Sequence, residues 1–188
     1  MGNFEAFILG IVQGLTEFLP VSSSGHLALA SHFFGFNQGE GEMALAIGIA
    51  TNTGTLLAVL LALRRDVAMA LAGFVAGLTS AEGRRTEGWR LALLVIIGCI
   101  PTAILGLLLR DSFESLAAPL PVAVMLAATG FLLWFAPTRQ RTRTSISDVR
   151  FLDAVIVGIA QGIAVLPGLS RSGTTISTLL FRGISSEL

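Results

Sequence analysis

Three long runs of uncharged, apolar residues restrict most strongly how this chain can fold. Residues 43–63, 91–109 and 116–136 each approach or exceed the roughly 20 residues that a helix needs to cross a bilayer. Only 13% of all residues are charged, against about 25% in an average soluble domain. Because backbone groups in lipid must be hydrogen-bonded within the protein, the sequence predicts an all-α integral membrane protein, with one membrane domain over residues 1–188.

Two further apolar segments carry polar residues and a break. Residues 4–36 are interrupted at Pro20, and residues 151–188 are interrupted at Pro167-Gly168. Proline and glycine end or break helices. Both segments are therefore expected to be re-entrant helix-break-helix segments, which leaves about three full transmembrane helices.

Arginine is concentrated after the first and third apolar runs. The residues concerned are Arg64, Arg65, Arg84, Arg85, Arg90, Arg139, Arg141, Arg143 and Arg150. The positive-inside rule places these connections in the cytoplasm. Asp153 then falls near the cytoplasmic edge, where we expect it to be solvated.

An internal repeat relates the two interrupted segments. Residues 6–30 align without gaps to residues 154–178. The alignment matches Gln13, Ser22, Ser24 and Gly25 with Gln161, Ser170, Ser172 and Gly173. Three spans separate the copies, and an odd number of crossings reverses the direction of the chain. The pattern indicates an inverted-topology repeat, whose broken helices usually build a site near the membrane midplane.

Each break is followed by serines, which are typical N-cap residues. The free N–H groups at a helix N-terminus form an anion site, and Arg171 would add a fixed positive charge. If both breaks face one pocket, the expected guest is one phosphate or two. Gln13 and Glu17 are four residues apart, so they share one face of the first helix.

The same pocket would hold groups able to do chemistry. His26 could act as a general acid or base, and a serine beside a base could be a nucleophile. Glu17 could protonate a leaving group or hold a metal that bridges phosphate oxygens. The serines could instead be only caps, and Glu17 and Arg171 could form a structural salt bridge. As a functional set, these residues fit phosphoryl transfer or hydrolysis on a membrane-embedded phosphate ester.

Two motifs carry a resemblance to a known family. QGLTEFLPVSSSGH (residues 13–26) resembles the first motif of the undecaprenyl-diphosphate phosphatase family of the bacitracin-resistance type, whose helix carries (E/Q)xxxE. PGLSRSGTT (residues 167–175) resembles its second motif, PGxSRSxxT. The likeness extends over essentially all 188 residues.

The resemblance implies a multi-pass enzyme of the bacterial plasma (inner) membrane whose site opens toward the outer, periplasmic face. It would hydrolyse undecaprenyl diphosphate to undecaprenyl phosphate and inorganic phosphate, recycling the carrier lipid for cell-wall synthesis and conferring bacitracin resistance. It implies a divalent cation, Ca²⁺ or Mg²⁺, and no organic cofactor. The expected partners are the polyprenyl diphosphate and the bilayer. A homo-oligomer is left open, and the net charge of zero gives no indication of nucleic-acid binding.

The resemblance also assigns roles to residues. Ser23 fills the position of the nucleophile, with Ser22 as its competitor, His26 that of the acid/base, and Arg171 that of the phosphate-binding arginine. Alternatively Glu17 shuttles the proton and His26 is the nucleophile. Glu17, and more weakly Gln13, would hold the cation. The other positions expected to bind substrate phosphates are Gln13, Ser22, Ser24, Gly25, Ser170, Ser172, Gly173 and Thr175.

Two departures from the family and one rival function accompany this interpretation. Gln13 stands where many members have glutamate, which leaves one carboxylate fewer for a cation. Members continue for roughly another half-domain of spans, as an inverted repeat requires, so we expect a fragment or a chain completed by a second one. The rival is a flippase or transporter of phosphorylated isoprenoid lipids, which would need no nucleophile–base pair.

Overall fold

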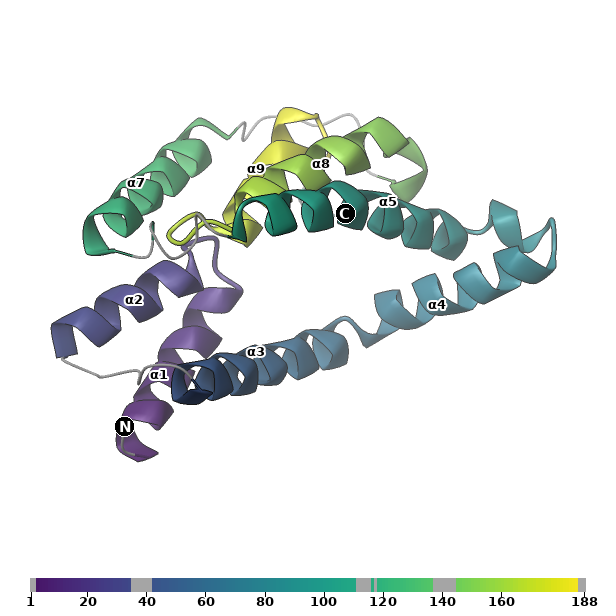
Figure 1. The fold of residues 1–188 in the computed structure, drawn as a ribbon. Helices are drawn as coiled ribbons and strands as arrows, with labels where there is room; N and C mark the ends of the chain where they lie inside the picture. Colours follow the sequence, from purple (N-terminus) through teal and green to yellow (C-terminus); the bar gives the residue numbers. More distant parts are fainter. Residues whose placement is uncertain (1–2, 35–41, 111–115, 117, 137–144, 186–188) are drawn as a thin grey trace. The chain divides into compact units, whose positions relative to one another are not determined.

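The computed structural model describes residues 3–34, 42–110, 116, 118–136 and 145–185, and this part of the chain is helical (Figure 1). The elements are α1 (Asn3–Glu17), α2 (Ser23–Phe34), α3 (Glu42–Ala62), α4 (Arg64–Thr79), the 3₁₀ turn η1 (Gly83–Arg85), α5 (Glu87–Leu108), α7 (Pro119–Phe135), the 3₁₀ turn η2 (Ile146–Asp148), α8 (Phe151–Ile163) and α9 (Arg171–Phe181). Arg139, Arg141 and Arg143, which the sequence assigns to the cytoplasmic side, lie outside the described residues.

The helix α5 is long and apolar enough to cross a membrane. It has 22 residues, and only 6% of its most apolar stretch is buried within the protein. A core helix of a soluble domain would be mostly buried, whereas a helix in lipid exposes apolar side chains. Shorter apolar helices in the described part are Ile49–Ala62, Pro119–Phe135 and Phe151–Ile163.

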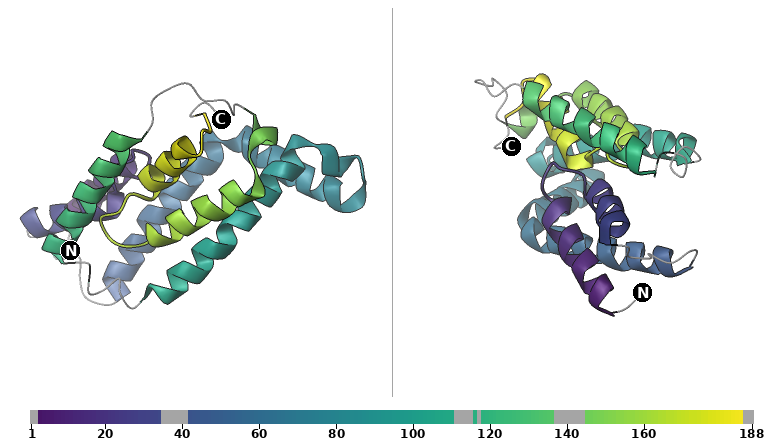
Figure 2. Two further views of the ribbon diagram at one scale, coloured as in Figure 1. Left: turned by 90° about the horizontal axis from the view of Figure 1, so that it is seen from above. Right: turned by 90° about the vertical axis from the view of Figure 1, so that its left-hand side faces the viewer.

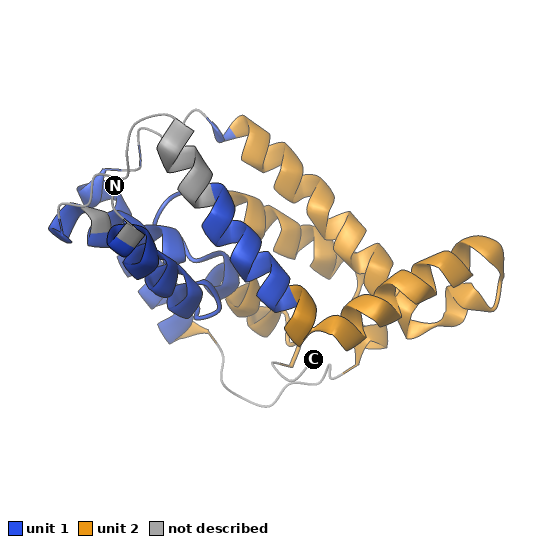
Figure 3. Cartoon of the chain, turned by 90° about the horizontal axis from the view of Figure 1, so that it is seen from below, with its two compact units in different colours: residues 1–59, 109–134, 164–174 blue, residues 60–108, 135–163, 175–188 orange. Residues whose placement is uncertain are grey.

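The chain divides into two compact units (Figure 3). Unit 1 comprises residues 1–59, 109–134 and 164–174, and unit 2 comprises residues 60–108, 135–163 and 175–188. Unit 1 contains both helix breaks, the hairpin of α1 and α2, and most of α7. Unit 2 contains the hairpin of α4 and α5, the helix α8 and the rest of α9. That the whole chain is one membrane domain stays a prediction.

Glycines allow the helices of unit 2 to pack closely. A side chain at Gly73 on α4 would collide with the backbone of Gly88 on α5. Beside this contact, Phe74 stacks on Trp89 with ring centroids 5.6 Å apart. A side chain at Gly158 on α8 would likewise collide with α5. The helices α4 and α8 thus both pack against α5 (Figure 2).

The prediction that Asp153 is solvated is wrong, because its side chain is fully buried. Its Oδ1 accepts a hydrogen bond from Arg182 Nε at 2.8 Å and lies 2.7 Å from Arg182 Nη2. Its Oδ2 accepts from the backbone N–H of Arg150 at 2.8 Å. A buried carboxylate must be paired and hydrogen-bonded, and here the pair fastens the start of α8 to the residue after α9.

Candidate active site

The first break turns the chain between α1 and α2. The helix α1 ends at Glu17, three residues before Pro20, and the turn is completed by Ser22 with φ of 66°. This left-handed conformation is uncommon for a residue with a side chain. Ser22 Oγ then accepts a hydrogen bond from the backbone N–H of Gly25 at 3.3 Å. Ser22 is therefore the buried N-cap of α2.

The carboxylate of Glu17 collects two side-chain donors. Gln13 Nε2 donates to Glu17 Oε2 at 2.7 Å, and Ser23 Oγ donates to the same oxygen at 2.5 Å. A hydroxyl that donates to a carboxylate makes a short, strong hydrogen bond. Of the two competing serines, Ser23 therefore faces a base, whereas the hydroxyl of Ser22 is used in capping the helix.

His26 lies one turn along α2 and is held by the same turn. Its Nδ1 is 2.8 Å from the carbonyl oxygen of Ser22. Because a carbonyl can only accept, Nδ1 donates this hydrogen bond, and in a neutral imidazole Nε2 is then the basic nitrogen. The structure records no hydrogen bond between Ser23 and His26, so Glu17 is the acceptor for the serine proton.

The second break repeats the cap of the first. Gly168 has φ of +92°, and Ser170 Oγ accepts from the N–H of Gly173 at 3.0 Å. Ser170 Oγ lies 3.2 Å from Ser172 Oγ, as Ser22 Oγ lies 3.3 Å from Ser24 Oγ. The aligned copies thus share the same cap, although the positive φ falls at Ser22 in the first break and at Gly168 in the second. Arg171, exposed at the start of α9, occupies the position that Ser23 has in α2.

The two breaks touch each other within unit 1. Ser172 Oγ donates to the carbonyl oxygen of Leu19 at 3.2 Å. A Cβ at Gly25 would lie 3.3 Å from Gly168 Cα, and one at Gly173 would lie 3.1 Å from the carbonyl oxygen of Pro20. The structure therefore brings Glu17, Ser23 and the start of α9 into one region, and both glycines lie where the backbones approach.

Thr129 on α7 is a positioning residue that the sequence analysis missed. Its buried Oγ1 accepts from the backbone N–H of Ser170 at 3.0 Å. Its own proton reaches the carbonyl oxygen of Met125 at 3.1 Å or that of Gly168 at 3.3 Å. The sequence does indicate such a role, because Thr129 is a lone threonine in the apolar run 116–136 and a polar group in such a run needs a hydrogen-bond partner.

Replacing Thr129 by valine should destabilise the second break. The substitution keeps the shape but leaves the buried N–H of Ser170 without an acceptor, at a cost of about 1–3 kcal/mol. Thermal unfolding in detergent should show a lower midpoint than for Thr53→Val, whose hydroxyl is exposed and bonds only the preceding turn. Equal midpoints for the two variants would contradict this role.

A cavity of about 500 Å³ lies beside the Glu17 cluster, between α1 and α3. Gln13 lines it, together with Thr51 and Thr55 of α3. The sequence TNTGT at residues 51–55 was a further missed signal, because it places hydroxyl and amide groups inside an apolar run. The cluster thus adjoins a mainly apolar cavity whose lining includes the polar side chains of Gln13, Thr51 and Thr55.

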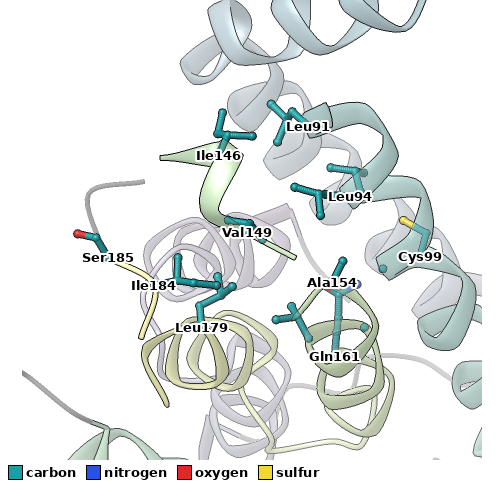
Figure 4. A pocket seen from close by; sticks show the side chains of 14 residues that line it. Leu91, Leu94, Cys99, Ile146, Val149, Ala154, Gln161, Leu179, Ile184 and Ser185 are labelled. Carbon is teal, nitrogen blue, oxygen red and sulfur yellow. The ribbon is translucent and has the colours of Figure 1, made fainter. Parts of the chain in front are cut away.

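Gln161, the repeat counterpart of Gln13, lies in unit 2, whereas the expected phosphate-binding residue Thr175 lies on α9. Gln161 donates to Thr102 Oγ1 at 3.3 Å in unit 2, where it lines a mainly apolar cavity of about 350 Å³ with Cys99 and Leu94 (Figure 4). It therefore serves interhelical packing there. Thr175 is half-buried on α9, one turn beyond Arg171.

A cation would find few protein ligands at this site. Among the described residues no group of three or more His, Cys, Asp or Glu side chains lies close enough to bind a metal. Both recorded hydrogen bonds of Glu17 fall on Oε2, which leaves Oε1 and the amide oxygen of Gln13 as oxygen donors. This set fits a Mg²⁺ held by one carboxylate and completed by substrate phosphates.

These observations describe a helical protein in which two serine-capped helix breaks meet beside a carboxylate and an arginine. The chain belongs to the family described as Bacitracin resistance protein BacA, which matches residues 6–188. It is 58% identical over 188 residues to an undecaprenyl-diphosphatase of Acaryochloris marina, covering 100% of this chain and 69% of that protein. It is 43% identical over 194 residues to an undecaprenyl-diphosphatase of Alkaliphilus metalliredigens, covering 100% of this chain and 70% of that protein. The expectation that this chain is a fragment stays a prediction.

Proposed function

We propose that this chain acts as an undecaprenyl-diphosphatase, which hydrolyses undecaprenyl diphosphate to undecaprenyl phosphate and inorganic phosphate and thereby confers bacitracin resistance. The relatives' names support the substrate. The observation that carries the proposal is the 2.5 Å hydrogen bond from Ser23 Oγ to Glu17 Oε2 at the start of α2. A hydroxyl activated by a carboxylate beside a helix N-terminus is suited to attack a phosphate.

The first step is attack by Ser23 Oγ on the terminal phosphorus. The serine proton passes to Glu17 as the new O–P bond forms. The bond from that phosphorus to the bridging oxygen breaks, and undecaprenyl phosphate leaves. Arg171 and the free N–H groups of α2 and α9 stabilise the negative charge on the transferred phosphoryl group.

The second step returns the enzyme to its starting state. Water attacks the phosphoserine and gives up a proton to a base, and the O–P bond to Ser23 breaks as Glu17 returns its proton to Ser23 Oγ. Inorganic phosphate then leaves, and the base releases its proton to water. His26 suits the base role because its Nε2 is the free nitrogen of the ring. The alternative, with His26 as the nucleophile, would give a phosphohistidine instead of a phosphoserine.

A divalent cation, Mg²⁺ or Ca²⁺, would be held by Glu17, with Gln13 as a weaker donor. When bound, it would neutralise charge on the phosphate oxygens. The remaining expected contacts, from Ser24, Ser172 and Thr175, would bind phosphate oxygens around Arg171.

The membrane arrangement proposed is an inverted-topology repeat with two re-entrant segments, in the plasma membrane of a bacterium, whose site opens toward the outer face. It is supported by the matched caps of α2 and α9, since broken helices in inverted repeats commonly form a central site. The isoprenoid tail would stay in the bilayer while the diphosphate enters the site.

The test is release of inorganic phosphate from undecaprenyl diphosphate by the purified chain in detergent, with and without EDTA. Glu17→Gln serves as the background control because it removes the acceptor of the Ser23 proton. We expect release by the wild type well above this background, and a loss on adding EDTA that excess Mg²⁺ or Ca²⁺ reverses. A folded wild type that releases no phosphate but moves the lipid across vesicles would favour the flippase instead.

A further inference from the structure

A pocket with polar and charged lining lies in unit 2, at the N-terminal end of α5. It has a volume of about 320 Å³ and is lined by η1, the first turns of α5, η2 and the start of α8. Three arginines, Arg84, Arg85 and Arg90, line it, with Glu87 as the one carboxylate. The lining therefore carries an excess of positive charge, and none of it belongs to the two breaks.

The guanidinium of Arg90 is fixed at the base of this pocket. Its Nε donates to the carbonyl oxygen of Ile146 at 3.1 Å, and its Nη2 donates to that of Val149 at 2.7 Å. Its Cζ also lies 5.6 Å from the centroid of the Phe151 ring. A charge held by two carbonyls and a ring is preorganised, so a ligand loses little affinity in ordering it.

The guanidinium groups of Arg84 and Arg85 have N–H groups that a ligand could use. Arg84 uses Nε for the carbonyl oxygen of Gly77 at 2.9 Å, which leaves its terminal nitrogens for a ligand. The guanidinium of Arg85 is exposed and makes no recorded hydrogen bond or ion pair with the described residues. Arginine binds phosphate oxygens in a planar, often bidentate manner.

The apolar side of the pocket indicates at which level of the membrane a ligand would lie. Trp89, Leu93 and Phe151 line it beside the arginines. Aromatic residues next to arginines are typical of the level of lipid headgroups, and the apolar stretch of α5 continues from here to Leu108. A ligand with a phosphate above an acyl chain matches both sides of the lining.

We infer that this pocket binds the phosphodiester of an anionic phospholipid, with the phosphate on Arg84, Arg85 and Arg90 and the first acyl carbons against Trp89 and Phe151. Free inorganic phosphate carries the same anionic oxygens as the lipid phosphodiester and could bind the same arginines. The apolar lining favours the lipid, because basic pockets beside membrane helices commonly hold anionic headgroups.

Trp89 provides a probe inside the pocket. The chain has two tryptophans, and Trp134→Phe leaves Trp89 alone. This protein is placed in phosphatidylcholine nanodiscs that contain a minor fraction of brominated phosphatidylglycerol or, in parallel, of brominated phosphatidylcholine. We expect stronger quenching of Trp89 by the anionic lipid. Arg85→Ala should weaken the association of the anionic lipid with the protein about fivefold, which is the contribution of one arginine near a charged lipid surface.

Arg64→Ala is the matched control, since it removes the same charge from an exposed arginine at the start of α4, outside the pocket. We expect the anionic preference to remain in this variant and to remain when inorganic phosphate is added at constant ionic strength. Equal quenching by both lipids would overturn the inference. So would a loss of association with the anionic lipid in Arg64→Ala as large as that in Arg85→Ala. Displacement by inorganic phosphate would assign the pocket to a free anion.

Discussion

Replacing Ser23 by alanine should lower the rate of phosphate release by about 10³–10⁴-fold, because it removes the attacking group of the first step. The loss should appear in kcat, with little change in the apparent affinity for undecaprenyl diphosphate. Single-turnover phosphate release measures it directly. Acid-quenched samples of the wild type should in addition contain phosphoserine at Ser23.

Ser22→Ala separates the two neighbouring serines. Ser22 caps α2 and is buried, so its loss should cost about 0.5–2 kcal/mol of stability and change the chemical step less than Ser23→Ala. Thr53→Val controls for a general effect of losing a hydroxyl in unit 1. A folded Ser23→Ala protein with the turnover of wild type would exclude Ser23 as the nucleophile, and a phosphohistidine at His26 would identify the alternative.

Replacing Arg171 by alanine should lower kcat by about 10²–10³-fold, which is the usual effect of removing one preorganised group that stabilises transition-state charge. Arg171 begins α9 and is exposed, and thermal unfolding of the variant separates an effect on folding from one on catalysis. Steady-state kinetics in detergent would check the change.

Arg64→Ala is again a matched control, because Arg64 is an exposed arginine that begins the helix α4. It should leave phosphate release unchanged. Retained kcat in Arg171→Ala, with only a raised KM, would contradict stabilisation of the transition state and would mean that Arg171 contributes only to substrate binding.

The repeat is the reason why much of this site could be predicted from the sequence. Aligning Ser22 with Ser170 and Gly25 with Gly173 implied two matching breaks, and both copies have the same cap. The alignment could not say which serine is the cap. The hydrogen bonds show it: Ser22 Oγ accepts from the N–H of Gly25, whereas Ser23 Oγ donates to Glu17.

The failures concern partners that are distant in the sequence. The position of Asp153 near a helix end predicts a solvated side chain, but Arg182, 29 residues further along the chain, pairs with its buried carboxylate. Thr129 is one polar residue in an apolar run, and its partners, Gly168 and Ser170, lie in the second break, about 40 residues further along the chain. Local patterns predict caps and breaks because these depend on neighbouring residues, whereas buried pairs depend on tertiary packing.

The central claim is that the two breaks, far apart in the sequence, form one phosphatase site. Single-turnover phosphate release by wild type, Ser23→Ala, Arg171→Ala and the double variant tests it most directly. Residues that act as a unit have strongly non-additive effects, so we expect the double variant to be about as slow as Ser23→Ala alone. Losses that multiply in the double variant would contradict the account, because they would mean that Ser23 and Arg171 act independently.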